Sequence, residues 1–254
     1  MRKARQSGEQ LELSRSALKM RLLKRLRCTL RYEKQAWEGG AKLVAGVDEV
    51  GRGSLFGPVV AAAVILNPED RIRGLRDSKL LLPERREVLA ERIRARAVAF
   101  SIASVDAETI DRINIYQASR MAMAMAAAQL SVRPDHLLID ALNIDFDCPQ
   151  TKIIHGDALS ASIAAASIIA KVERDRMMRE FDGVYPGYGL ASNKGYSTPF
   201  HKQMLREVGP SALHRQSFAP VWMTNATAPQ ELLEFMQEEA LPADAGEAEA
   251  LAQA

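Results

Sequence analysis

The chain has 254 residues, of which 47% are hydrophobic and 26% are charged, a composition typical of a globular protein with a sizeable core. No uninterrupted apolar stretch reaches the roughly 18 residues of a membrane helix, and the first residues lack the apolar segment of a secretory signal. Cys28 and Cys148 are too few for a disulfide scaffold or a four-ligand zinc site. We therefore expect a cytoplasmic protein with no membrane partner.

The net charge of +2 hides an asymmetry between the two ends of the chain. Residues 1–35 hold eleven Lys or Arg and three Glu, whereas residues 221–254 hold seven Asp or Glu and no Lys or Arg. A basic N-terminus suggests a polyanionic partner, although a solvated helix face explains the same charge.

Three parts follow from composition and periodicity. Residues 1–41 form a basic helical extension, with helical spacing of leucines over 11–37 that stops at Gly39 and Gly40. Residues 42–221 form the compact domain, and residues 222–254 form an acidic tail that we expect to be disordered.

Short apolar runs and longer periodic segments alternate through the compact domain. Strands are predicted at 43–47, 59–66, 98–104, 137–140 and 152–154, and helices at 83–97, 107–130, 160–181 and 199–208. Because only residues 51–58 separate the first two strands, those strands are expected to form a hairpin. The later alternation of strands and helices indicates an α/β domain with a mixed sheet.

Carboxylates follow three of the predicted strands. Asp48 and Glu49 end the first strand, and Asp140 ends the strand at 137–140. Asp157 follows the strand at 152–154 after a histidine and a glycine, although it would also suit a helix entry. Because open α/β sheets bind ligands at the carboxyl ends of their strands, these acids are candidates for one site.

Clustered carboxylates repel one another unless a cation neutralises them. Their hard oxygen atoms are the ligands that Mg²⁺ or Mn²⁺ prefers. Four carboxylates can hold two such ions about 3.5–4 Å apart, the arrangement used for in-line attack on a phosphodiester. The four acids therefore predict a two-ion nuclease site.

Two other readings of the motifs fail. The glycines after Glu49 are spaced one residue too far apart for a dinucleotide fingerprint, and a strand follows where that motif needs a helix. Ser78 with Lys79, and Ser167 with Lys171, lack the spacing of Ser-Lys acyl-transfer enzymes.

Five blocks along residues 42–218 resemble type 2 ribonuclease H (ribonuclease HII). They are GVDEVGRGSLFGPVVAAAVIL, RDSKLL, LLIDAL, HGDALSASIAAASIIAKVERDR and NKGYSTPFH. The segment RYEKQAWEGG is similar to the linker that precedes the domain in bacterial members with an N-terminal extension. Val50 and Phe56 depart from the family pattern, where smaller residues are usual, and neither is a ligand.

The resemblance implies the ribonuclease H-like fold, with a mixed five-stranded sheet flanked by helices. It implies hydrolysis of the RNA strand of RNA/DNA hybrids, and nicking 5′ of single ribonucleotides embedded in duplex DNA during ribonucleotide removal. Asp48, Glu49, Asp140 and Asp157 would bind two Mn²⁺ or Mg²⁺ ions, and the products would carry 3′-hydroxyl and 5′-phosphate ends.

The resemblance also assigns substrate contacts. Gly51, Arg52 and Gly53 would form a turn that approaches the ribose 2′-hydroxyl closely, together with Tyr196. Lys79 and Lys171 would contact phosphates, although each also suits a surface position. We expect a monomer, and we interpret His201, near Tyr196, as ordering its loop rather than binding a metal.

Two alternatives stay open. Another metal nuclease of the same fold, of the resolvase or transposase type, would also need clustered acids. A non-catalytic nucleic-acid binding module could use the basic N-terminus. Small residues over 160–170 would let that helix lie close to the sheet and fix Asp157.

Overall fold

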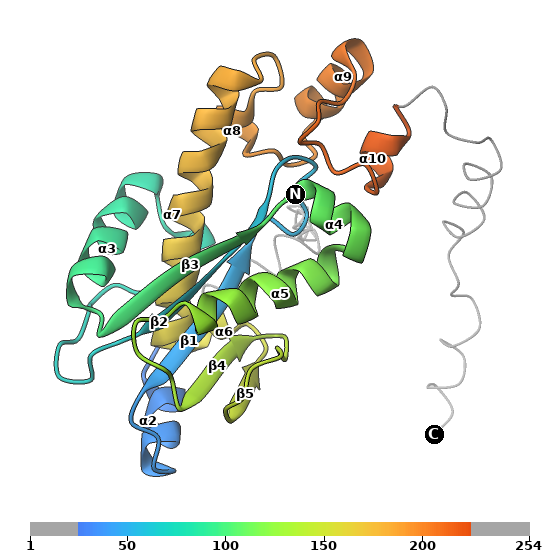
Figure 1. Ribbon diagram of the computed structural model, residues 1–254. Coiled ribbons are helices and arrows are strands. Elements are labelled where there is room, and N and C mark those ends of the chain that lie inside the picture. Colours follow the sequence, from blue (N-terminus) through green and yellow to red (C-terminus); the bar gives the residue numbers. More distant parts are fainter. Residues whose placement is uncertain (1–24, 225–254) are drawn as a thin grey trace, which may run out of the picture. The chain divides into compact units, whose positions relative to one another are not determined.

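The computed structural model describes residues 25–224 (Figure 1). These residues divide into two compact units. The first unit holds the described residues up to Val50, together with Val60–Ala103 and Arg120–Glu173. The second holds Gly51–Val59, Ser104–Ser119 and the described residues from Arg174 onward.

A five-stranded sheet in the order β3-β2-β1-β4-β5 organises the chain. Strand β1 pairs antiparallel with β2 and parallel with β4, and β4 pairs parallel with β5, so the predicted mixed sheet and hairpin are confirmed. The strands are β1 (Val44–Val50), β2 (Val59–Ile65), β3 (Ala99–Val105), β4 (His136–Asp140) and β5 (Gln150–Ile153).

Burial along the strands follows their places in the sheet. Every residue of β2, with the sequence VVAAAVI, is buried, as expected for an interior strand covered on both faces. Strand β3, at one end of the strand order, alternates buried and more exposed residues.

Helices connect and cover the strands (Figure 1). They are α2 (Arg31–Glu38), α3 (Pro83–Arg96), α4 (Ala107–Ile113), α5 (Ile115–Ala128), α6 (Gly156–Leu159), α7 (Ala161–Val184), α8 (Leu190–Asn193), α9 (Pro199–Val208) and α10 (Ala219–Trp222), with a 3₁₀ turn η1 (Ser78–Leu80). Within the described residues, no helix combines the length and apolar character needed to cross a membrane.

The first turn of α7 lies against β1, as the small residues of that helix predict. A Cβ atom added to Gly46 would sit 2.1 Å from the Ser162 carbonyl carbon and 2.3 Å from the Ile163 nitrogen. No side chain fits in so short a distance, so Gly46 permits the close contact that holds the start of α7 to the sheet.

Two helix predictions need correction. The segment 107–130 contains two helices, because Asn114 adopts a φ of 66°. The backbone of Asn114 leaves the helical conformation, with a ψ of 161°, and its side chain accepts a hydrogen bond from the Gln117 amide in the first turn of α5. In the described part of the predicted helix at 11–37, only Arg31–Glu38 is helical.

Helix α2 packs on the sheet of the first unit and lies at one end of it in Figure 1. Tyr32, Ala36 and Trp37 share one face of the helix and contact a buried cluster that includes Val44 and Ile163. The predicted start of the compact domain at residue 42 therefore leaves out a helix that contributes to this core. Of the predicted acidic tail, 222–254, residues 225–254 lie outside the described part of the chain, as do the residues before 25.

Candidate active site

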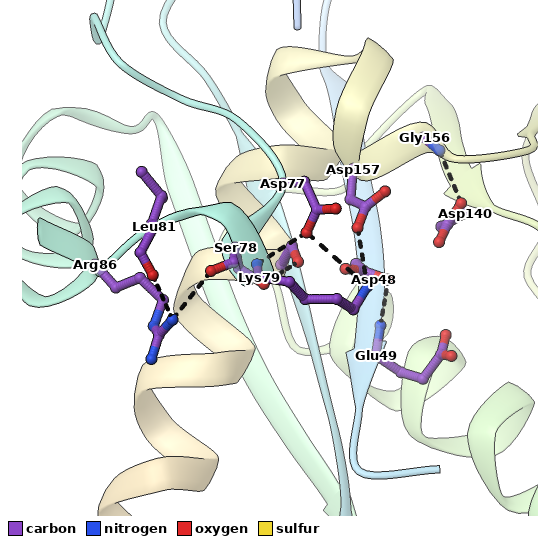
Figure 2. A network of polar contacts seen from close by, with 11 residues as sticks. Asp48, Glu49, Asp77, Ser78, Lys79, Leu81, Arg86, Asp140, Gly156 and Asp157 are labelled. Atoms are coloured by element: carbon purple, nitrogen blue, oxygen red, sulfur yellow. Dashed lines mark hydrogen bonds and ion pairs between the residues drawn. The ribbon is translucent and has the colours of Figure 1, made fainter. Parts of the chain in front are cut away.

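Four carboxylates of the first unit, here called the acid group, come from β1, β4 and α6. They are Asp48, Glu49, Asp140 and Asp157 (Figure 2). Asp48 and Glu49 lie inside β1, which continues to Val50 rather than ending before them. The Glu49 amide donates a hydrogen bond of 2.9 Å to Asp48 Oδ1, and Figure 2 shows the Glu49 side chain directed away from Asp48.

Asp140 and the turn that carries Asp157 are joined directly. The Gly156 amide donates a hydrogen bond of 2.8 Å to Asp140 Oδ1. Ala141, just after Asp140, and His155, just before Gly156, both adopt positive φ, at 54° and 58°. Such backbone costs roughly 1–2 kcal/mol per residue other than glycine, and strain of this kind concentrates at functional sites.

Burial and mutual repulsion raise the pKa of the acids. The pKa of Asp48 lies well above its usual value, first because the side chain is buried and then because Glu49, Asp140 and Asp157 lie nearby. A hydrogen bond with Ser167 partly offsets this rise. Burial likewise raises the pKa of Asp157 and of Asp140, against the opposing charge of Lys79.

Lys79 contributes a positive charge to the acid group. Its Nζ lies 3.3 Å from Asp157 Oδ2 and 3.9 Å from Asp77 Oδ1. Burial alone would lower the pKa of Lys79, but the charges of Asp157, Asp77 and Asp48 outweigh it and raise that pKa. The predicted phosphate contact therefore lies among the acids, as Figure 2 shows.

The 3₁₀ turn η1 holds Lys79 in place. Asp77 Oδ1 accepts a hydrogen bond from the Lys79 amide, and Ser78 Oγ lies 3.0 Å from Ser167 Oγ on α7. Arg86 donates hydrogen bonds to the carbonyls of Ser78 and Leu81. Sequence reasoning assigned no such role to Arg86, because nothing in its local pattern distinguishes it from other arginines of α3.

The donor set of the acid group suits a hard divalent cation, because its ligands are carboxylate oxygens. Between residues 25 and 224, no three His, Cys, Asp or Glu side chains already stand close enough to hold a metal ion. Like charges at this spacing repel one another. Because burial and neighbouring acids raise the pKa of Asp48, Asp140 and Asp157, a cation bound between these acids would stabilise their ionised forms.

The second unit contains the Gly51–Pro58 loop and the segment around Tyr196. Ser54 and Tyr196 form an isolated β-bridge, and the Leu55 amide donates to the Gly195 carbonyl at 2.8 Å. Gly51, Arg52 and Gly53 begin this loop. The backbone contacts therefore connect the loop that contains the predicted glycine-rich turn to the segment that contains Tyr196.

Arg174, on α7, is fully buried and holds both segments. Its guanidinium donates hydrogen bonds to the carbonyls of Pro58, Phe56 and Lys194 and to Ser54 Oγ. Its Cζ atom lies 5.6 Å from the centroid of the Tyr196 ring, within cation–π range. A Cβ atom on Gly51, which has a φ of 92°, would sit 2.2 Å from Arg174 Nε, so only glycine fits there.

Arg215 is a second fully buried arginine in this unit. Its Nε and Nη1 donate to the carbonyls of Gly57 and Arg52. Burial, followed by the nearby charge of Arg174, lowers the pKa of Arg215 to about 9, which leaves it protonated at neutral pH. Sequence reasoning missed both arginines, because a buried arginine that donates hydrogen bonds to backbone carbonyls does not belong to a recognisable sequence motif.

A pair of histidines, His201 and His214, holds the backbone of Tyr196. Because the Ser211 amide donates to His214 Nδ1, the ring proton of His214 lies on Nε2. That nitrogen lies 3.1 Å from His201 Nε2, and His201 Nδ1 then donates to the Tyr196 carbonyl at 3.0 Å. This geometry agrees with the prediction that His201 orders the loop that contains Tyr196. Lys171, the other predicted phosphate contact, lies on α7 and is partly buried.

The fold and the acid group together define the class of protein. A mixed β3-β2-β1-β4-β5 sheet, with acids on β1, at the end of β4 and just before α7, is the ribonuclease H-like fold. A sequence model of the family described as Ribonuclease HII matches residues 45–221. The chain belongs to the ribonuclease HII family.

Individual relatives agree with this assignment. A ribonuclease HII of Koribacter versatilis is 67% identical over 227 residues, which is 89% of this chain and 89% of that protein. Among solved structures, the ribonuclease HII of Archaeoglobus fulgidus, solved in a complex with PCNA, is 28% identical, with a TM-score of 0.61 over 70% of this chain and 95% of that one.

A more distant structure, Bst-RNase HIII in complex with Mn²⁺, shares the fold at 21% identity, with a TM-score of 0.53 over 87% of this chain and 76% of that one. The family membership establishes the activity of this chain, which is that of a type 2 ribonuclease H. It is an endonuclease and a hydrolase, and its substrates are nucleic acids.

Proposed function

We propose that this chain cleaves the RNA strand of RNA/DNA hybrids, and nicks duplex DNA on the 5′ side of a single ribonucleotide, at the acid group. The observation that carries the proposal is the placement of Asp48, Asp140 and Asp157 in neighbouring parts of the first unit. The Gly156 amide binds Asp140, Lys79 pairs with Asp157, and burial with mutual repulsion raises the pKa of the three acids. Groups with shifted pKa values that gather around complementary charges are typical of functional sites.

In this proposal Asp48, Glu49, Asp140 and Asp157 are the ligands of two divalent cations, Mn²⁺ or Mg²⁺. When bound, such cations supply Lewis acidity that activates a water molecule and stabilises the leaving 3′-oxygen, giving 3′-hydroxyl and 5′-phosphate ends. The Mn²⁺ held by Bst-RNase HIII, which has the same fold, supports this choice of metal.

The residues of the chain divide the remaining work. The Gly156 amide, which donates to Asp140 Oδ1, holds one carboxylate against the turn that carries another. The ammonium group of Lys79, 3.3 Å from Asp157, provides a fixed positive charge for a substrate phosphate. Lys171 contributes a second phosphate contact from α7.

Selectivity for RNA requires a detector for the 2′-hydroxyl, the group that distinguishes RNA from DNA. We assign this role to Gly51, Arg52 and Gly53, whose backbone can approach a sugar closely, together with the hydroxyl and ring of Tyr196. The hydrogen bonds of Arg174 and the His201–His214 pair support this assignment, because they fix both segments.

A labelled DNA duplex with one ribonucleotide, incubated with Mg²⁺, Mn²⁺ or EDTA, tests the proposal. We expect a metal-dependent nick on the 5′ side of the ribonucleotide. Cleavage of long RNA/DNA hybrid alone would retain the nuclease and reject the single-ribonucleotide role in removing ribonucleotides from DNA. Cleavage of an all-DNA junction would instead favour a nuclease of the resolvase type.

A further inference from the structure

Helix α2 places a buried carboxylate against the turn that carries Asp157. The Glu33 side chain is fully buried. Its Oε1 accepts hydrogen bonds from Ser160 Oγ at 2.6 Å and from the Ser162 amide at 2.8 Å. All of these residues belong to the first unit. A segment more than a hundred residues earlier in the chain therefore contacts the end of the catalytic turn.

The start of α7 explains how the Glu33 carboxylate can be buried. The first amides of a helix have no partner within the helix, and they carry the positive end of its dipole. Ser162 is the second residue of α7, a helix of 24 residues, and its amide points at Glu33. Glu33 therefore caps α7 from a distant part of the chain, and the helix stabilises its negative charge.

The backbone before α2 holds the same turn. The Thr29 amide donates to the Leu159 carbonyl at 3.0 Å, and the Ala161 amide donates to the Thr29 carbonyl at 3.0 Å. These bonds form a parallel bridge between Thr29 and Ser160. With the two bonds to Glu33, the segment from Thr29 to Glu33 contacts every residue from 159 to 162.

These contacts lead to the acid group through hydrogen bonds. The Ser160 amide donates to the Gly156 carbonyl at 2.8 Å, and the Gly156 amide donates to Asp140 Oδ1 at 2.8 Å. Asp157 lies between Gly156 and Ser160 in the same turn. Burial, followed by the charges of Glu33 and Asp157, raises the pKa of the Cys28 thiol to about 12.

We propose that Glu33 is a positioning residue of the active site, which fixes the Gly156–Ser162 turn so that Asp157 and Asp140 keep the arrangement that binds divalent cations. This inference rests on the proposed function, in which both aspartates are ligands. Partners that orient metal ligands commonly influence metal affinity or activity by about 10–100-fold. The segment from Thr29 to Glu33 then supports the active site rather than forming an accessory arm.

The test uses full-length Glu33→Ala and Glu33→Gln variants, with Glu38→Ala as the matched control. Glu38 lies on the same helix and is exposed. The readouts are kcat and KM on the single-ribonucleotide duplex, and Mn²⁺ binding without substrate, measured by calorimetry. For Glu33→Ala we expect a fall in kcat of about 10–100-fold, weaker Mn²⁺ binding and an unchanged KM.

The glutamine and control variants sharpen the test. The amide oxygen of Glu33→Gln can still accept from Ser160 and Ser162, so this variant should recover most of the lost kcat and Mn²⁺ affinity. Glu38→Ala should match the wild type. A Glu33→Ala protein with a lower Tm, but with wild-type kcat per active site and wild-type Mn²⁺ affinity, would show a purely structural role and overturn the proposal.

If Glu33→Ala does not fold, Ser160→Ala carries the test, because it removes one donor to Glu33. It also removes the acceptor of a 3.2 Å hydrogen bond from the Ile163 amide in the first turn of α7. We expect weaker Mn²⁺ binding and a lower kcat, and wild-type values would overturn the proposal. Failure of the proposed function gives a different result, since Asp157→Asn would then cleave as fast as the wild type.

Discussion

The acid group and the Gly51–Pro58 loop bury opposite charges and use them differently. In the acid group, burial raises the pKa of Asp48 and Asp157, so the fold holds negative charge that it does not fully neutralise. Around the Gly51–Pro58 loop, burial lowers the pKa of Arg174 and Arg215. Each region bears the cost of desolvating ions.

The difference lies in where each charge finds its partners. Arg174 and Arg215 donate to backbone carbonyls of the loop itself, so their charge fixes a shape. The carboxylates of Asp48 and Asp157 face other acids and one lysine, so their charge favours the binding of an external cation. The buried arginines therefore stabilise the conformation of the Gly51–Pro58 loop, whereas the acid group favours the binding of a cation.

Replacing one acid should have the largest effect. For Asp140→Asn we expect a loss of cleavage of at least about 1,000-fold, or about 4 kcal/mol of transition-state stabilisation. Binding of the hybrid should remain largely intact, since phosphate contacts provide most of it. Cleavage assays in Mg²⁺ and binding by fluorescence anisotropy measure the two effects.

Asp145→Asn is the matched control for this variant, because Asp145 is exposed on the loop after β4. It should cleave like the wild type. Normal turnover by Asp140→Asn would contradict the assignment of the acid group.

Changing Arg174 to lysine should have an intermediate effect, on stability rather than on cation binding. A lysine keeps the charge but cannot donate to four acceptors in a plane. Unsatisfied buried carbonyls should cost roughly 2–4 kcal/mol, which lowers Tm by about 4–16 °C. The rise in Tm on adding Mn²⁺ should persist, and calorimetry with and without Mn²⁺ measures both quantities.

Arg176→Lys is the control for this change, since Arg176 is exposed on the same helix. Its Tm should match the wild type. An unchanged Tm for Arg174→Lys would show that the loop does not depend on the fork of hydrogen bonds.

Acid should affect the two regions in opposite directions, and this is the smallest predicted effect. Burial first, and then His201, lower the pKa of His214 to about 4, whereas an unfolded histidine titrates near 6.5. The unfolded state therefore binds more protons between these values, and the contribution of His214 to stability is lost as pH falls from about 6.5 to 4. The acids, with raised pKa values, contribute in the opposite sense.

A His214→Gln variant isolates the histidine contribution. The stability difference between wild type and variant should shrink by about 1–3 kcal/mol between pH 7 and pH 4.5. Chemical denaturation at several pH values measures this difference. A difference that stays constant with pH would show that the His201–His214 pair does not stabilise the fold as two neutral rings.

The sequence predicts much of the sheet, because strand periodicity and loop length are local properties. Helix α9 matches its prediction in full, since Thr198 and Pro199 are strong start signals and Gly209 follows its end. The prediction of one helix over 107–130 was wrong at Asn114, because its positive φ and its hydrogen bond from the Gln117 amide depend on a single residue in an otherwise continuous pattern.

Of the candidate site, the acids were accessible to sequence reasoning because each follows or ends a recognisable strand. The supporting residues were not. Glu33, Arg174 and Arg215 act over long sequence distances on backbone groups, and a single sequence does not show which amides and carbonyls lack partners. Their roles became visible only from the hydrogen bonds.

The bridge between Thr29 and Ser160 has a consequence for the order of synthesis. About 130 residues separate the two partners along the chain, and ribosomes add roughly 5–20 residues per second, so Thr29 waits roughly 7 to 26 s before Ser160 is made. During that interval Trp37 and Glu33 have no core to enter. The nascent segment around Thr29 must therefore remain soluble before its partners exist, and the surplus of Lys and Arg over residues 1–35 favours solubility during that delay.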